Sequence, residues 1–586
     1  MQHIKSVLFI LIIGFLSTHT TFAQSFNRVL GTGAGSSLST GNRNTMIGDS
    51  AGVSVTTGTF NTFLGFGAGR FSTARDLTAI GYYAGYRNTT GFDNTFIGAE
   101  AGKSNTTAGD NTFIGVKAGE FNTTGSDNTF VGEEAGATNT TGDDNTFIGE
   151  DAGKDNTTGY DNTFVGNASG TFSTTGYRNT GVGSLALLDV STGHHNTGIG
   201  DSAGVDVGSG LYNTFIGAAS GAATEHADYN TFVGAYAGWE NNRTNSTTNA
   251  NRNTYVGFRA GYNNRDGQDN VGMGAYSDFN NTDRSRCTFI GAASTPAEND
   301  VTSFGYSNFN SGQYGITIGS QLDLRAIGAI GIGRTAKVNS DANYAIGIGY
   351  AVDIDSTDAI GIGRGTDLAG RNSISIGANN VLSGSNSIVI GSNNNLTGDG
   401  QVFLGNPSTQ SIGGTVNWTA LSDGRFKRNI QEDIPGLDFI QALRPVSYQF
   451  DLDQMYRFNG IDSLSKDLQK GAAQKSQTRF TGFIAQEVQR AAHNLGYDFS
   501  GVKIPEDTTN QAYGIRYAEF VVPLTKAVQE LNQKVEEQQQ IMFSQAEQLE
   551  KYQRNAEQTQ KMMSELSARL DALEQSQIYP TISIRD

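Results

Sequence analysis

Apolar and polar positions alternate in a short unit that repeats through the first four hundred residues. The unit is Asn-Thr-Phe-Ile-Gly with small changes, and its glycine recurs every 17 residues from Gly31 to Gly291, apart from one step of 16 and one of 23. The step is then 14 as far as Gly405, again with one step of 16, which makes 24 units in all. Helix-pair and propeller repeats need about 30 residues or more. The period therefore predicts a β-solenoid with one coil per unit.

Each coil is expected to contain two short strands joined by turns. In Asn372–Gly377 and Asn386–Gly391 the apolar residues alternate before the glycine, as a strand with one buried face requires. The glycine supplies a sharp bend. An Ala-Gly pair a few residues later is small enough for coils to stack closely, and Asn-Thr-Thr-Gly runs such as the one at Asn122 form the opposite turn.

An aromatic residue stands beside the isoleucine in many units. The recurrent positions are Phe96, Phe113, Phe130, Phe147 and Phe164. If the isoleucine faces inward, the phenylalanine faces outward, and a column of exposed Phe requires a partner. We therefore expect identical chains to associate along this column.

A heptad pattern runs unbroken from residue 521 to about residue 575. Its a positions are Val521, Val528, Val535, Met542, Leu549, Ala556, Met563 and Leu570, and its d positions are Leu524, Leu531, Gln538, Gln545, Tyr552, Thr559, Leu566 and Leu573. The pattern predicts a coiled coil. Val at a with Leu at d favours two strands by rule, so the heptads alone leave the number of strands open.

The stretch between the repeats and the heptads reads as ordinary mixed α/β sequence. Apolar residues from Ile434 to Leu443 predict a short helix before Pro445, and Val446–Phe450 alternates like a strand. Residues 457–479 are polar and rich in Lys, Ser and Gln, which predicts a loop. Thr481–Val488 is expected to lead from a strand into a helix.

The N-terminus has the pattern of a signal peptide. Lys5 precedes the apolar run Val7–Leu16, and Thr21-Phe22-Ala23 offers a cleavage site with small residues. We predict a signal peptide over 1–23 and a secreted or cell-surface protein. No later segment reaches 18 apolar residues, so no membrane span is expected in the mature chain.

Composition argues against several classes of partner. The formal net charge is −17, whereas nucleic-acid binding needs a basic face, so nucleic acid is not an expected partner. Cys287 is the single cysteine, and the six histidines show no ligand spacing, so we predict no metal and no cofactor.

Nucleophilic chemistry is plausible at Leu421–Ile430, where Ser422 stands five residues before Lys427. A serine hydroxyl is inert until a neighbour takes its proton, and a lysine does so only when burial or adjacent cations disfavour its charged form. Arg425 and Arg428 could supply that repulsion, and Asp423-Gly424 could supply a turn that joins the pair. The alternative is a plain polar surface turn.

The 14-residue units resemble the head repeats of trimeric autotransporter (YadA-like) adhesins. The residues that match are those of 372–377, 386–391, Ile316–Gly319 and Ala359–Gly363. The 17-residue units depart from that pattern by three residues per coil and by a Thr where a second inward aliphatic residue is expected. The handedness of those coils stays open.

The tail resembles the intramolecular chaperone domain of phage endosialidase tailspikes, the peptidase S74 family, over about residues 416–575. The matching blocks are Ser422–Ile430, Leu443–Tyr448, Gly482–Val488, Tyr517 and the heptad helix. The resemblance implies a domain that trimerises, guides folding of the preceding fibre and cuts itself off through a Ser–Lys dyad. Ser422 would be the nucleophile and Lys427 its general base, with cleavage at Leu421, Ser422 or Asp423. The segment 457–479 is longer than the family pattern leads us to expect.

The fold class predicted is mainly β: a long parallel β-solenoid of about 24 short coils, a small α+β chaperone domain and a C-terminal coiled-coil helix. The corresponding domains are 1–23, 24–410, 411–520, 521–575 and a tail at 576–586.

The function predicted is a secreted homotrimeric fibre, adhesive or structural, matured by self-cleavage. Its partners would be its own copies and a cell-surface or glycan receptor. The alternatives are a fibre that is never cleaved and a tailspike-like fibre with glycan-binding activity.

Overall fold

The computed structural model describes residues 26–279, 283–459, 466–509 and 511–576. The predicted signal peptide and nearly all of the predicted terminal tail lie outside these ranges. The chain divides into two compact units, Met1–Leu404 and Gly405–Asp586.

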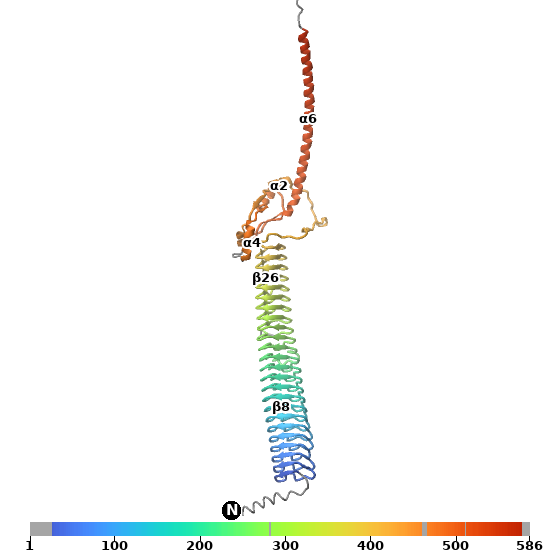
Figure 1. The fold of residues 1–586 in the computed structure, drawn as a ribbon, viewed down its shortest axis with the longest axis vertical. Coiled ribbons are helices and arrows are strands. Elements are labelled where there is room, and N and C mark those ends of the chain that lie inside the picture. Colours follow the sequence, from blue (N-terminus) through green and yellow to red (C-terminus); the bar gives the residue numbers. More distant parts are fainter. Residues whose placement is uncertain (1–25, 280–282, 460–465, 510, 577–586) are drawn as a thin grey trace, which may run out of the picture. The chain divides into compact units, whose positions relative to one another are not determined.

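The N-terminal unit is a parallel β-solenoid, which confirms the predicted fold class (Figure 1). Each coil adds one strand to a 24-stranded sheet, and every strand pairs in parallel with the strand of the next coil. Its strands are β1 (Arg28–Leu30), β2 (Thr45–Ile47), β3 (Thr62–Leu64), β4 (Thr78–Ile80), β5 (Thr95–Ile97), β6 (Thr112–Ile114), β7 (Thr129–Val131), β8 (Thr146–Ile148), β9 (Thr163–Val165), β10 (Thr180–Val182), β11 (Thr197–Ile199), β12 (Thr214–Ile216), β13 (Thr231–Val233), β14 (Thr254–Val256), β15 (Val271–Met273), β16 (Thr288–Ile290), β18 (Thr302–Tyr306), β20 (Ile316–Ser320), β22 (Ile330–Arg334), β24 (Ile346–Tyr350), β26 (Ile360–Arg364), β28 (Ile374–Ala378), β30 (Ile388–Ser392) and β32 (Val402–Leu404).

The expectation of two strands per coil is correct for the 14-residue coils and wrong for nearly all the 17-residue coils. The short coils add a second, eight-stranded parallel sheet, made of β17 (Thr295–Pro296), β19 (Phe309–Asn310), β21 (Asp323–Leu324), β23 (Lys337–Val338), β25 (Asp353–Ile354), β27 (Asp367–Leu368), β29 (Val381–Leu382) and β31 (Asn395–Leu396). In a longer coil the backbone enters the left-handed region repeatedly, for example at Glu100, Gly102 and Asp110. These turns interrupt the extended backbone that a second strand would need.

The prediction that the phenylalanines face outward is wrong. Phe96 and its four equivalents are fully buried, and successive rings stack inside the solenoid, as Phe113 and Phe130 do with centroids 4.7 Å apart. Each ring fits because the glycine at the following turn of the same coil has no side chain. A Cβ on Gly136, for example, would lie 2.6 Å from the ring of Phe130. Since side chains alternate along a strand, the isoleucine after each phenylalanine faces outward.

The isoleucines of the 14-residue coils also face outward, contrary to the predicted pattern. Ile374 and Ile376 are partly exposed, whereas Ser375 between them is buried. The second strand fills the interior instead, with buried aliphatic residues such as Leu368 and Leu382. In most 17-residue coils the large inward side chain therefore comes from the first strand. In most 14-residue coils it comes from the second strand.

Buried asparagines join neighbouring coils through two ladders. In the first, the backbone N–H of Asn128 donates to Asn111 Oδ1 at 3.0 Å, and that of Asn145 donates to Asn128 Oδ1 at 2.9 Å. In the second, Asn139 Nδ2 donates to Asn122 Oδ1 at 2.7 Å. These side chains provide hydrogen-bond partners for backbone and side-chain groups that are buried inside the coil.

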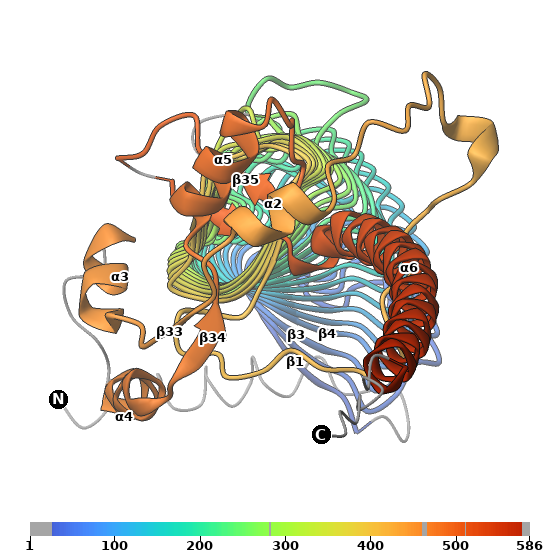
Figure 2. The same ribbon diagram turned by 90° about the horizontal axis from the view of Figure 1, so that it is seen from above.

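The C-terminal unit contains the elements that the apolar pattern predicts on either side of residues 457–479 (Figure 2). They are α2 (Leu437–Ala442), β33 (Val446–Tyr448), β34 (Phe480–Gly482), α5 (Ala485–Asn494) and α6 (Val521–Gln575). The unit also contains three elements that were not predicted: β35 (Val502–Lys503), β36 (Gly514–Ile515) and the 3-10 helix η2 (Tyr517–Phe520). The strands form two antiparallel pairs, β33 with β34 and β35 with β36. Phe439 of α2 lies at the centre of the core with Val488, Phe499 and Phe520.

The loop predicted over 457–479 is wrong. It contains the end of α3 (Leu452–Phe458) and the whole of α4 (Lys466–Gln477). Lys, Gln and Ala dominate α4 and are good helix formers even without an apolar stripe. Buried Leu452, Tyr456 and Ala472 make a small core of their own for this hairpin.

Helix α6 confirms the predicted helix but does not test its pairing into a coiled coil. It has 55 residues, and only Pro523 and Ala527 are buried in the single chain. Its first turns pack on α2, where Glu530 accepts a hydrogen bond from the N–H of Leu437 at 2.6 Å. Among the described residues, none of the helices is both long enough and apolar enough to cross a membrane.

Candidate active site

The segment that contains the candidate serine and lysine is an exposed connection. Between residues 411 and 436 its only regular structure is one 3-10 turn, η1 (Gly424–Phe426). Large apolar side chains along it are turned to solvent in the single chain: Trp418 is 87% exposed and Leu421 is 83% exposed, with Phe426 and Ile430 in a similar state. Exposed apolar side chains at this density are typical of a surface that another chain covers.

The turn predicted at Asp423-Gly424 is present as η1. The Asp423 carboxylate caps it by accepting a hydrogen bond from the N–H of Arg425 at 2.9 Å. The turn brings the two candidate residues together, since Lys427 Nζ donates to Ser422 Oγ at 2.7 Å. Both side chains are exposed in the single chain. The same nitrogen, once deprotonated, is placed to accept the serine proton.

Arg425 is engaged in a way that the sequence did not indicate. Its guanidinium pairs with Asp423, with Nη2 and Oδ2 2.6 Å apart, and this pairing lowers the pKa of the Asp423 carboxyl. The carboxylate offsets the charge of Arg425, so its expected repulsion of Lys427 is weakened. Arg428 is exposed and is left as the second flanking cation.

Sequence blocks that lie far apart in the tail meet in space. Arg444 pairs with Glu487 of α5, and their Nη2 and Oε1 atoms are 2.6 Å apart. The N–H of Phe483 donates to the hydroxyl of Tyr517 at 3.1 Å. A Cβ on Gly482 would lie 2.1 Å from that hydroxyl oxygen, which explains the glycine. The blocks Leu443–Tyr448, Gly482–Val488 and Tyr517 thus form one structural unit.

Two residues with specific contacts were not predicted as part of a site: Tyr456 lies on α3, just before the segment predicted as a loop, and Lys475 lies on α4, within that segment. Tyr456 and Lys475 bond to the connection that follows the last solenoid strand. No metal site accompanies the candidate residues: within the described ranges, no three His, Cys, Asp or Glu side chains gather closely enough to bind an ion.

A comparison with known families identifies a match in the C-terminal unit. Residues 422–497 match the peptidase S74 family, described as the chaperone of endosialidase, and the match begins at Ser422. This confirms the resemblance inferred for the tail. No curated protein matches the chain. The chain thus joins a long β-solenoid to a segment that is similar to the chaperone of endosialidase.

Proposed function

We propose that this protein is a secreted, homotrimeric fibre whose C-terminal unit directs assembly and is then separated by self-cleavage at or beside Ser422. The observation that carries the proposal is the 2.7 Å contact between Lys427 Nζ and Ser422 Oγ. It lies at the start of the segment that matches the chaperone of endosialidase.

The chemistry requires only groups of this chain and water. Neutral Lys427 takes the proton of the Ser422 hydroxyl, and Oγ attacks the carbonyl carbon of Leu421. The peptide C–N bond breaks as the amine of Ser422 leaves with a proton, and an ester to Oγ remains. Water then hydrolyses the ester, which leaves a carboxylate on Leu421 and regenerates the hydroxyl. Because the carbonyl is on the neighbouring residue, proximity supplies much of the rate.

Assembly would supply the water-excluding surroundings that a lysine base needs. In the single chain the pair is exposed, and Trp418, Leu421 and Phe426 around it are exposed too. Burial of these side chains by other copies would favour the neutral form of the lysine. Cleavage would therefore follow assembly.

An outward apolar column supports self-association of the solenoid, in place of the phenylalanine column expected from sequence. Each of the 24 strands of this sheet contributes one residue to the column, namely its third residue, which directly precedes the repeat glycine. All of these residues are apolar, and none of them is buried. We call this set the apolar column: Leu30, Ile47, Leu64, Ile80, Ile97, Ile114, Val131, Ile148, Val165, Val182, Ile199, Ile216, Val233, Val256, Met273, Ile290, Phe304, Ile318, Ile332, Ile348, Ile362, Ile376, Ile390 and Leu404. An unbroken apolar ridge of this length fits burial against the same ridge of other copies.

Self-cleavage is tested on denaturing gels of freshly expressed protein. We expect two bands from the natural chain and one band from Ser422→Ala. Lys427→Arg should also give one band, because arginine keeps the positive charge but does not release its proton. Lys503→Ala, a lysine change on β35, serves as the matched control and should leave two bands. A single band from the natural chain would instead favour the uncleaved trimeric fibre.

A further inference from the structure

The α3–α4 hairpin binds four residues that lead away from the last solenoid strand. We call residues 406–409 the linker. Lys475 Nζ donates to the backbone carbonyls of Pro407 and Thr409 at 2.6 and 2.8 Å. The hydroxyl of Tyr456 is hydrogen-bonded to Ser408 Oγ. Three consecutive polar contacts therefore reach the linker from one hairpin.

The linker is shaped to present these groups. The N–H of Thr409 donates to the carbonyl of Asn406 at 2.9 Å, and the N–H of Asn406 donates to Thr409 Oγ1 at 2.7 Å. The N–H of Ser408 donates to Asn406 Oδ1 at 2.9 Å. A closed turn of this kind is defined by its own hydrogen bonds, so it can bind as a preformed unit.

The two binding side chains are fixed by the hairpin core. Tyr456 is 2% exposed and packs with Leu452 and Ala472. Lys475 Nζ lies 5.6 Å from the centre of the Phe450 ring, and its partial burial lowers the pKa of the ammonium. If the linker departed, this half-buried charge would lose both of its carbonyl partners.

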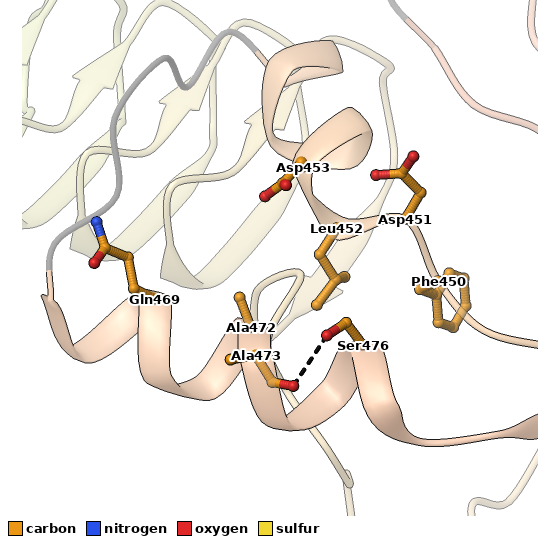
Figure 3. A pocket seen from close by; sticks show the side chains of 8 residues that line it. All are labelled: Phe450, Asp451, Leu452, Asp453, Gln469, Ala472, Ala473 and Ser476. Carbon is orange, nitrogen blue, oxygen red and sulfur yellow. Dashed lines mark hydrogen bonds between the residues drawn. The ribbon is translucent and has the colours of Figure 1, made fainter.

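Helices α3 and α4 do not fill all of the space between them. Figure 3 shows Leu452 directed across the space between α3 and α4 toward Ala472 and Ser476. Beside it is a hollow of about 350 Å³ that Asp451 and Gln469 also line. The contacts to the linker therefore act together with the core of Leu452, Tyr456 and Ala472 in holding the hairpin.

Cleavage would place the two sides of this contact on different chains. The linker precedes Ser422 and would remain with the fibre, whereas Tyr456 and Lys475 follow it and would remain with the tail. We infer that the α3–α4 hairpin is a retention site, which keeps the cleaved tail bound to the new C-terminal segment of the fibre. Cleavage and release would then be separate events. This inference rests on the proposed function for its biological meaning.

The test does not depend on self-cleavage. In the full-length Ser422→Ala chain, the recognition sequence of a site-specific protease is inserted between Gly413 and Gly414, where an added Cβ on Gly413 meets nothing within 4 Å. After cutting, we expect the tail to co-elute with the fibre in size-exclusion chromatography. Tyr456→Phe removes one hydrogen bond and should speed dissociation about 10-fold, whereas Lys475→Met removes two and should speed it by at least about 10-fold. Lys503→Met should leave the rate unchanged.

Two outcomes would overturn the inference: a tail that separates from the unsubstituted hairpin as soon as it is cut, or dissociation rates that neither variant changes. Circular dichroism of the uncut chains checks that the variants are folded. Tyr456→Phe keeps the buried ring, so it remains informative even if Lys475→Met unfolds the hairpin. A single band from the natural chain would contradict the proposed function, while the inserted protease site would still measure retention.

Discussion

The repeat glycine that follows the Phe-Ile pair must be a glycine for two reasons, as Gly132 shows. Gly132 has a φ of +148°, which side-chain-bearing residues rarely adopt. A Cβ there would also lie 2.1 Å from the carbonyl oxygen of Gly149 in the next coil. The sequence indicates the first requirement, because a regular glycine marks a bend. The second depends on how closely coils stack, and becomes visible only in the structure.

Gly132→Ala should therefore destabilise the solenoid locally, by about 2 kcal/mol or more from the backbone conformation and the clash. Hydrogen exchange of the amides in the flanking coils measures this, since a long repeat array need not unfold in one step. Gly413→Ala is the control, because its Cβ meets open space. Equal protection of the flanking amides in both variants would contradict the argument.

In the 17-residue coils Phe faces inward and Ile faces outward, which is the reverse of the prediction. In Thr-Phe-Ile-Gly two adjacent residues are apolar, so alternation alone does not decide which of them faces the core. The inward position could have been identified from the sequence, because a small residue there is compensated by a larger residue in another position. Gly181 and Gly198 replace the phenylalanine in neighbouring units. Leu187 fills the space beside Gly198, with its Cγ 2.8 Å from a Cβ built on that glycine. A position whose size is compensated elsewhere faces inward.

At the scale of elements, prediction succeeded where apolar residues have a clear period. Helices α2 and α6 and strand β33 lie where the pattern places them. Helix α4 was missed because its one buried described side chain, Ala472, provides no apolar stripe. The C-terminal unit shows the same division. The turn at Asp423 follows from residue types, whereas the contacts of Tyr456 and Lys475 depend on α3 and α4, neither of which was predicted.

Helix α6 is the element on which assembly should depend. Deleting Lys534–Gln575 keeps the turns that pack on α2, including Glu530, but removes most of the heptads. We expect the truncated protein to be largely monomeric by light scattering, and its self-cleavage to fall at least about 10-fold if the site needs other copies. Deleting only 577–586 is the control. A truncated chain with the mass and cleavage of the full chain would show that the heptads are dispensable.

At the scale of the whole molecule, the apolar column should determine whether the fibre stays assembled. Ile148 is 39% exposed in the single chain and belongs to this column. Ile148→Glu would bury an unpaired charge in each copy on assembly, at a cost of about 3 kcal/mol or more. We expect the variant to dissociate at higher protein concentration in sedimentation experiments. Thr141→Glu, an exposed change in the same coil, is the control, and equal dissociation of both would rule out the column as the interface.

The second asparagine ladder also determines how this protein can be produced. Asn88, Asn105, Asn122, Asn139 and Asn156 each begin an Asn-Thr-Thr triplet, which is an acceptor sequence for N-linked glycans. All five side chains are fully buried. A sugar attached through Nδ2 cannot coexist with the closed coil, so glycosylation of the nascent chain and solenoid folding exclude one another. Expression through a eukaryotic secretory pathway is therefore expected to prevent folding of the solenoid. Expression in a compartment that lacks the glycosylating enzyme is compatible with folding.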